Sequence, residues 1–168
     1  MHKRALNEIL AGYRLKVGGT HGINHWSRVL ANGRRLTPLT GADPVVVDLF
    51  AIFHDARREN EGRDPGHGAR GGKLAQQFRR QGLIDLTHVQ LELLVYACAH
   101  HTSGRTEADI TVQTCWDADR LDLGRVGITP DPARLCTDAA RDPEMIAWAD
   151  KRAWDEWRSF ALDDWLKA

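Results

Sequence analysis

The chain has 168 residues, of which 42% are hydrophobic and 27% are charged, the composition of an ordinary globular protein with one domain. Lysine plus arginine and aspartate plus glutamate each number 23, so the formal net charge is zero. Without an overall positive field we expect no dedicated nucleic-acid-binding module, and no apolar run approaches the roughly 20 residues that span a bilayer.

Apolar residues recur with helical spacing along most of the chain, and hardly any segment alternates with period two. The predicted fold class is therefore all-α, with a single helical domain over residues 1–168. In chain order, the spacing predicts helices over about 5–17, 21–36, 45–56, 67–80, 85 or 87–101, 109–121 and 143–166. Residues 56–68 and 127–132 are predicted to form a loop and a turn.

The helix that begins after Asp43-Pro44 is expected to be central to the fold. A carboxylate N-cap followed by proline is a start signal, and the segment VVVDLFAIFHDA that follows is apolar nearly all round. The β-branched residues 45–47 could suggest a strand, but the proline and the length of the segment favour a helix.

The cysteines indicate a reducing compartment. There are three, none in a CxxC pair, so a disulfide framework is not expected: Cys98, Cys115 and Cys136. The first residues lack the apolar core of a signal peptide, and we expect a cytoplasmic protein.

Histidines and aspartates gather at the ends of the predicted helices. His21 and His25 share one helix face, His54-Asp55 closes the most apolar helix, and three aspartates lie in the segment WDADRLD. An unpaired carboxylate at the end of an apolar helix costs several kcal/mol, and metal coordination is one of the few sufficient compensations.

Three segments carry a resemblance to a known family. His25 opens HWSRV, His54-Asp55 follows LFAIF, and Asp119 lies in ADRL. In this order and at these separations they resemble the H…HD…D signature of the HD superfamily of metal-dependent phosphohydrolases, over roughly residues 20–125. The resemblance implies an HD-type helical bundle and a divalent ion held by His25, His54, Asp55 and Asp119. Asp117 is the alternative to Asp119, but two residues along a helix it would point elsewhere.

Some members of this superfamily hold two ions. His67, His100 and His101 stand where ligands of a second ion are expected, with Asp55 as the bridge; alternatively, His67 and one of the other two contact the substrate. Imidazole and carboxylate ligands suit Mn, Fe, Co, Ni or Zn.

The implied chemistry is attack by a water whose pKa an ion lowers towards about 7. Asp55, Glu59 and Arg58 are the predicted catalytic residues, with Glu59 orienting the water or protonating the leaving group. Guanidinium groups suit phosphate, and the predicted substrate-binding residues are Arg57, Arg58, Arg63 and Lys73.

We therefore expect hydrolysis of a phosphomonoester or phosphodiester, with a nucleotide or another small phosphorylated metabolite as substrate. A di-iron oxygenase of the HD type and a non-catalytic nucleotide-binding regulatory module are the alternatives. The sequence leaves the oligomeric state open, and the basic loop after His54-Asp55 could equally be a solvated surface loop.

Overall fold

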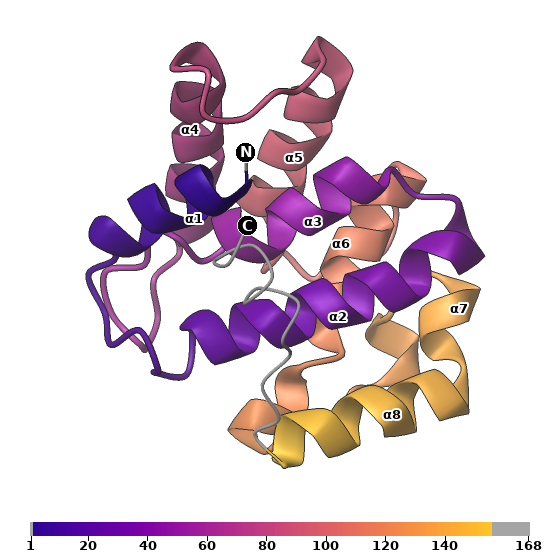
Figure 1. The fold of residues 1–168 in the computed structure, drawn as a ribbon. Helices are drawn as coiled ribbons and strands as arrows, with labels where there is room; N and C mark the ends of the chain where they lie inside the picture. Colours follow the sequence, from indigo (N-terminus) through magenta and orange to yellow (C-terminus); the bar gives the residue numbers. More distant parts are fainter. Residues whose placement is uncertain (1, 156–168) are drawn as a thin grey trace.

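A computed structural model describes residues 2–155 of the chain. Within that range it contains eight α-helices, two short 3-10 helices and no strand, which confirms the all-α prediction (Figure 1). The elements are α1 (His2–Ala11), α2 (Ile23–Thr40), α3 (Pro44–Phe53), α4 (His67–Arg80), α5 (His88–His100), α6 (Ile110–Arg120), η1 (Leu123–Val126), η2 (Pro132–Arg134), α7 (Asp138–Arg141) and α8 (Pro143–Trp154).

Several helix boundaries differ from the predictions; the central helix, for example, ends at Phe53 rather than at residue 56. The first helix ends at Ala11 rather than at residue 17, and the Arg57 guanidinium donates to the carbonyls of Ile9 (3.4 Å) and Gly12 (3.2 Å) at that end. The second continues to Thr40, where Gly41 adopts the left-handed conformation (φ 75°) that ends a helix. The last helix of the described range ends at Trp154, and the rest of the predicted 143–166 helix lies outside that range.

Helix α3 forms the centre of the molecule, as predicted. The Asp43 carboxylate accepts hydrogen bonds from the backbone N–H groups of Val45 (2.8 Å) and Val46 (3.3 Å), and Pro44 occupies the first turn. Helices α1, α2, α4, α5 and α6 all pack against α3, whose residues 49–53 are at most 1% exposed. His54 follows directly, so the chain carries this histidine into the interior.

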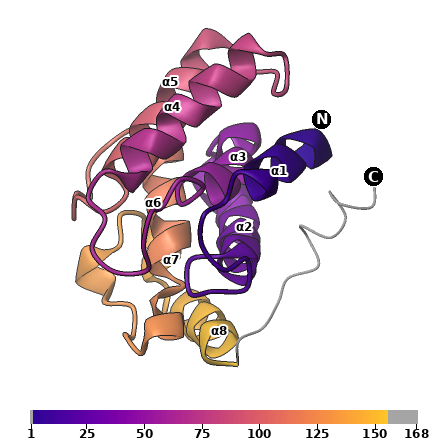
Figure 2. The same ribbon diagram turned by 90° about the vertical axis from the view of Figure 1, so that its left-hand side faces the viewer.

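Helices α4 and α5 form an antiparallel pair that projects from α3 (Figures 1 and 2). Glycines in α4 permit a close approach to both neighbours. A Cβ atom at Gly68 would lie 2.1 Å from the Cys98 carbonyl oxygen in α5, and one at Gly71 would lie 2.1 Å from the Phe53 carbonyl oxygen in α3. This close packing brings the start of α4 next to the ends of α3 and α5.

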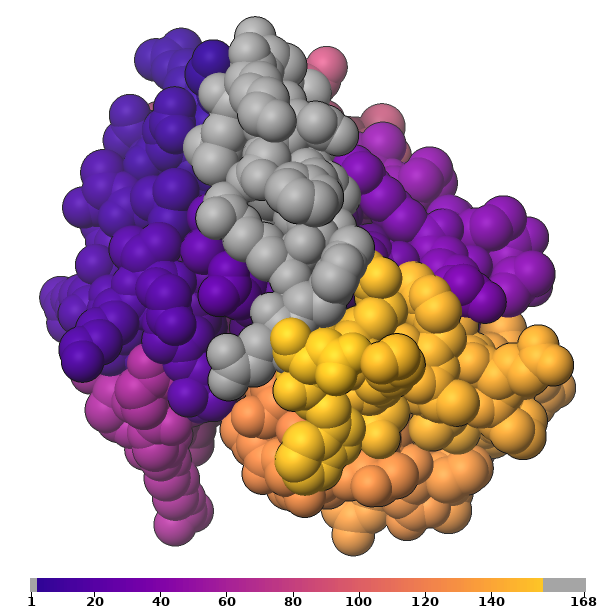
Figure 3. All heavy atoms as spheres, turned by 60° about the horizontal axis from the view of Figure 1, so that its bottom comes forward, coloured from indigo at the N-terminus to yellow at the C-terminus, as the bar shows by residue number. Residues whose placement is uncertain are grey.

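The chain after α6 packs against α2 through α7 and α8. It contains η1, η2, α7 and α8, where the sequence predicted only a turn before the last helix. A second, smaller apolar cluster joins this part to α2; it consists of Leu36, Leu121, Leu135, Ala140, Met145 and Ala149. Figure 3 shows the residues from η1 to α8 gathered on one side of the molecule.

None of the helices between residues 2 and 155 has both the length and the apolar character that crossing a bilayer requires.

Candidate metal centre

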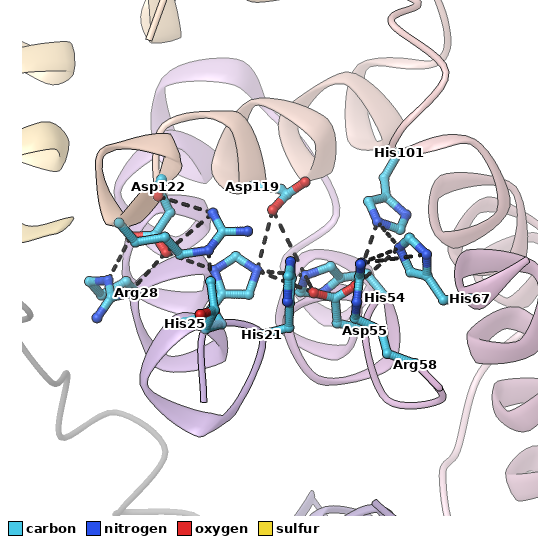
Figure 4. Close-up of polar contacts among 12 residues, drawn as sticks. His21, His25, Arg28, His54, Asp55, Arg58, His67, His101, Asp119 and Asp122 are labelled. Carbon is cyan, nitrogen blue, oxygen red and sulfur yellow. Dashed lines mark hydrogen bonds and ion pairs between the residues drawn. The ribbon is translucent and has the colours of Figure 1, made fainter. Parts of the chain in front are cut away.

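Six histidine and aspartate side chains from five segments of the chain converge in the interior (Figure 4). They come from α2, from the residues just after α3 and α5, from the first residue of α4 and from α6. They form two sets, and within each set the candidate ligand atoms lie within 4.8 Å of one another. We call His25, His54 and Asp119 the first triad, and Asp55, His67 and His101 the second triad.

The Asp55 carboxylate lies between the two triads. Its Oδ2 atom is 3.7 Å from Nε2 of His25 and 3.7 Å from Nε2 of His54. Its Oδ1 atom is 3.1 Å from Nε2 of His67 and 3.9 Å from Nε2 of His101. One carboxylate therefore offers one oxygen to each triad, the arrangement that a bridge between two ions requires.

The four histidine rings are oriented in the same way. Each has Nδ1 next to an acceptor, so each donates from Nδ1–H and directs Nε2 into the centre. For three rings the acceptor is a backbone carbonyl three or four residues earlier: that of Phe50 for His54 (3.0 Å), of Asp64 for His67, and of Cys98 for His101 (2.7 Å). For His25 it is the Asp122 carboxylate, at 2.7 Å. This tautomer leaves Nε2 as a ligand in every neutral ring.

The Nε2 atoms of His25 and His54 lie only 3.0 Å apart. Two lone pairs at that distance repel each other unless a proton or a cation lies between them. Metal–nitrogen bonds of about 2.0–2.1 Å hold two nitrogens at right angles about 2.9 Å apart, so the observed spacing fits a shared ion. Burial lowers the pKa of His54 to about 3, which keeps this ring neutral and able to act as a ligand.

The carboxylates of the centre stay ionised. Burial raises the pKa of Asp55, but the surrounding rings, His54 first among them, outweigh burial and hold that pKa well below its usual range. The pKa of Asp119 is lowered in the same way by His25 and His54, although its side chain is only 16% exposed. Two ionised carboxylates next to imidazole nitrogens favour a bound cation, and mixed nitrogen and oxygen donors suit a transition metal.

Arg58 donates into the second triad. Its Nη1 atom lies 3.2 Å from Oδ1 of Asp55 and 3.1 Å from Nε2 of His67, while Nη2 donates to the Gly62 carbonyl at 2.8 Å. The Nε2 atoms of His67 and His101 are 2.9 Å apart. A second ion would therefore compete with the Arg58 guanidinium, whereas no arginine contact of this kind is found at the first triad among residues 2–155.

Asp122 supports the first triad and was not assigned a role from the sequence. Its carboxylate accepts from His25 and, at 2.6 and 3.2 Å, from Nε and Nη2 of Arg28, and the side chain is 1% exposed. Burial raises the pKa of Asp122, but the hydrogen bonds from His25 and Arg28 outweigh it and lower that pKa. Its position three residues after Asp119, about one helical turn, is the signal that could have identified it.

Asp117 points away from the centre, as predicted. Its carboxylate accepts from the backbone N–H groups of Cys136 (2.6 Å) and Thr137 (2.8 Å) and from the Thr137 hydroxyl (2.8 Å). It thereby fixes the chain that enters α7.

A cavity of about 220 Å³, which we call the inner cavity, reaches the centre from outside. It is lined by His21, Asp55, Arg58, His101, Thr102, Asp119, Arg120, Leu123 and Arg125. The cations of this cavity are thus Arg58, which the sequence predicted, and Arg120 and Arg125, which it did not.

His21 lies on the wall of the inner cavity and pairs with Glu61. Its Nδ1 atom is 2.6 Å from the Glu61 carboxylate, and its side chain is 13% exposed. Burial lowers the pKa of His21, although Glu61 opposes this effect. A neutral imidazole held by a carboxylate can accept and return a proton.

Several predicted site residues lie elsewhere, and the predictions for them are corrected. Arg57, Glu59 and Lys73 line a separate cavity of about 310 Å³ between α1 and α4. Glu59 is 51% exposed there and faces Arg14 (3.3 Å) and Arg70 (3.9 Å), so it neither orients water nor protonates a leaving group at the centre.

Arg63 and His100 are also absent from the centre. Arg63 is exposed on the loop before α4 and does not line the inner cavity. His100 is rotated away because the next residue, His101, takes the inward position at the end of α5; its ring packs against Tyr96 at 4.5 Å between centroids.

Comparison of the chain with known protein families, with curated proteins and with solved structures finds no match.

Proposed function

We propose that this protein is a divalent-metal-dependent phosphohydrolase of the HD type, acting on a phosphomonoester or phosphodiester of a nucleotide or another small metabolite. The observation that carries the proposal is the first triad together with Asp55. Two imidazole Nε2 atoms and two ionised carboxylates face one another in the interior, with an arginine-lined cavity directly outside.

In this proposal, His25, His54, Asp55 and Asp119 hold one ion of Mn, Fe, Co, Ni or Zn, and Asp55, His67 and His101 hold a second. A bound ion would supply a Lewis acid for a phosphoryl oxygen and would lower the pKa of a water molecule. The backbone carbonyls and Asp122 keep the four rings in the ligating tautomer.

Arg120 and Arg125 bind the phosphate in this scheme, with Arg58. Arg125 donates to the Thr20 carbonyl at 3.3 Å and to the Asp122 carbonyl at 3.0 Å, which positions its guanidinium on the cavity wall. Guanidinium groups fixed before binding lose little further entropy when they pair with phosphate oxygens.

His21 transfers the proton. With Nδ1–H donated to Glu61, Nε2 is able to accept a proton from attacking water and return it to the leaving oxygen, and the carboxylate stabilises the charged ring. Water adds to phosphorus, the ester P–O bond breaks, and the products are an alcohol and a phosphate.

The test is metal content and phosphate release in matched variants. Protein purified without chelator should contain one or two transition ions per chain and release phosphate from a general phosphomonoester, and Asp55→Asn should lose both properties. Asp48→Asn is the control, because Asp48 is also paired with an arginine (Arg34, 2.7 Å) but lies remote from the centre. Metal retention and turnover unchanged in Asp55→Asn would overturn the proposal.

A di-iron oxygenase is the second candidate, and the position of Asp55 between the two triads is the observation that favours it. Iron content combined with substrate-dependent oxygen consumption would identify that chemistry. The arginines of the inner cavity favour the hydrolase.

A further inference from the structure

A second and larger cavity opens next to the inner one. It has a volume of about 790 Å³, and we call it the outer cavity. The two cavities adjoin, because four residues line both of them: His101, Thr102, Arg120 and Leu123. The other residues of the outer cavity come from the loop after α5 and from the segment between η1 and α7.

The walls of the outer cavity are largely apolar. Leu123, Ile128, Pro130 and Leu135 contribute aliphatic surface, and Ile128 is 53% exposed. A large apolar side chain this exposed on a cavity wall gains by contact with a ligand. Among the described residues, no phenylalanine, tyrosine or tryptophan lines this cavity, and polar groups such as Thr129 and Asp131 complete its lining.

Arg120 stands where the two cavities meet, and the protein fixes it there. Its Nη1 atom donates to the Arg134 carbonyl (2.7 Å) and to Sγ of Cys136 (3.3 Å), and Nη2 donates to the Arg105 carbonyl (2.6 Å). These bonds use three of the five N–H groups of the guanidinium, which leaves two for a ligand.

We propose that the outer cavity binds the alcohol part of the substrate, and that this part is a bulky ring system with apolar faces, of nucleoside size or smaller. The phosphate would then lie against Arg120 in the inner cavity. This inference rests on the proposed function, which places the phosphate of the substrate in the inner cavity. Nucleotides belong to this substrate class, and phosphates of small polyols do not.

The size of the cavity agrees with this assignment. Pockets for small molecules measure about 300–1,000 Å³ and are lined mainly by apolar side chains with a few polar groups that orient the ligand. The inner cavity alone, at about 220 Å³, is below that range. A substrate of nucleotide size would therefore extend beyond it, and the outer cavity adjoins it.

Binding of phosphonates tests the inference independently of turnover. The Zn-loaded protein is titrated calorimetrically with methylphosphonate and with naphthylmethylphosphonate, which share the anionic group and differ in the apolar part. The bulky probe should bind at least tenfold more tightly. In Ile128→Asp that preference should fall to less than threefold, while the affinity for methylphosphonate stays within twofold. Leu39→Asp is the matched control, because Leu39 is 66% exposed on α2 and lines neither cavity.

Each result separates the two proposals. Equal affinity for the two probes, or a preference that survives in Ile128→Asp, overturns the assignment of the outer cavity. No phosphate release from naphthylmethyl phosphate, with the binding preference intact, removes the proposed hydrolase and leaves the binding site in place. Failure of both probes to bind overturns both.

Discussion

Replacing Asp122 with asparagine should weaken the binding of one ion and spare the other. Asp122 accepts the Nδ1–H of His25 at 2.7 Å, and His25 belongs only to the first triad. Asparagine keeps the shape and one acceptor oxygen but removes the negative charge that makes the ring a better ligand.

The expected magnitude follows from this geometry. Loss of an outer hydrogen-bond partner of a ligating histidine costs about 10–100-fold in metal affinity, or about 1.4–2.7 kcal/mol. The second triad is oriented by backbone carbonyls, so its affinity should change less than threefold. The substitution also removes the buried charge that faces Arg28, and disruption of a buried pair costs up to about 3–5 kcal/mol of folding stability.

The assay is a competition titration with a chromophoric chelator at a temperature where circular dichroism shows the variant to be folded. Wild type should release two ions, and Asp122→Asn should release one of them at a 10–100-fold lower chelator concentration. Asp48→Asn should match wild type in both steps. Equal weakening of both ions, or of neither, would refute the role of Asp122 and the separation into two triads.

Three further predictions concern packing, capping and the thiols. Gly71→Ala should lower the free energy of unfolding by about 1–3 kcal/mol or more in urea titrations, because the new Cβ atom would meet the Phe53 carbonyl oxygen. In the control Gly18→Ala, the new Cβ atom meets nothing within 4 Å, so the free energy of unfolding should change by less than about 0.5 kcal/mol. Thr87→Ala should cost about 1 kcal/mol in the same titration, because it removes the capping box that Thr87 forms with Gln90 at the start of α5, and a change below about 0.3 kcal/mol would contradict this. Burial raises the pKa of the thiols of Cys98, Cys115 and Cys136, that of Cys136 to about 12. Iodoacetamide at pH 8 should therefore modify these thiols only after the protein unfolds. Modification of the folded protein at the rate of the unfolded protein would contradict their burial.

The central helix and the residues that follow it could be predicted from sequence because their signals are local. Asp43-Pro44 marks a helix start regardless of what surrounds it, and an apolar segment of this length must be buried. The four proposed ligands of the first ion were identified by order and spacing, and the structure brings all four together.

The arginines could not be assigned correctly because their direction depends on tertiary packing. Arg57 and Arg58 are neighbours in sequence, yet one caps α1 and the other reaches Asp55. Arg120 reaches the inner cavity from the end of α6, and Arg125 reaches it from η1, a short helix that no sequence pattern indicated. His100 and His101 could not be separated either, since a one-residue change in where α5 ends exchanges them.

The shared position of Asp55 decides how the centre could be dissected genetically. Any substitution of Asp55 disturbs both triads at once, so it is not a route to a protein with a single ion. A mononuclear form would have to be made by replacing a ligand that belongs to one triad alone, such as His67 or His101 in the second triad. Such a variant would reveal which steps of turnover one ion can sustain.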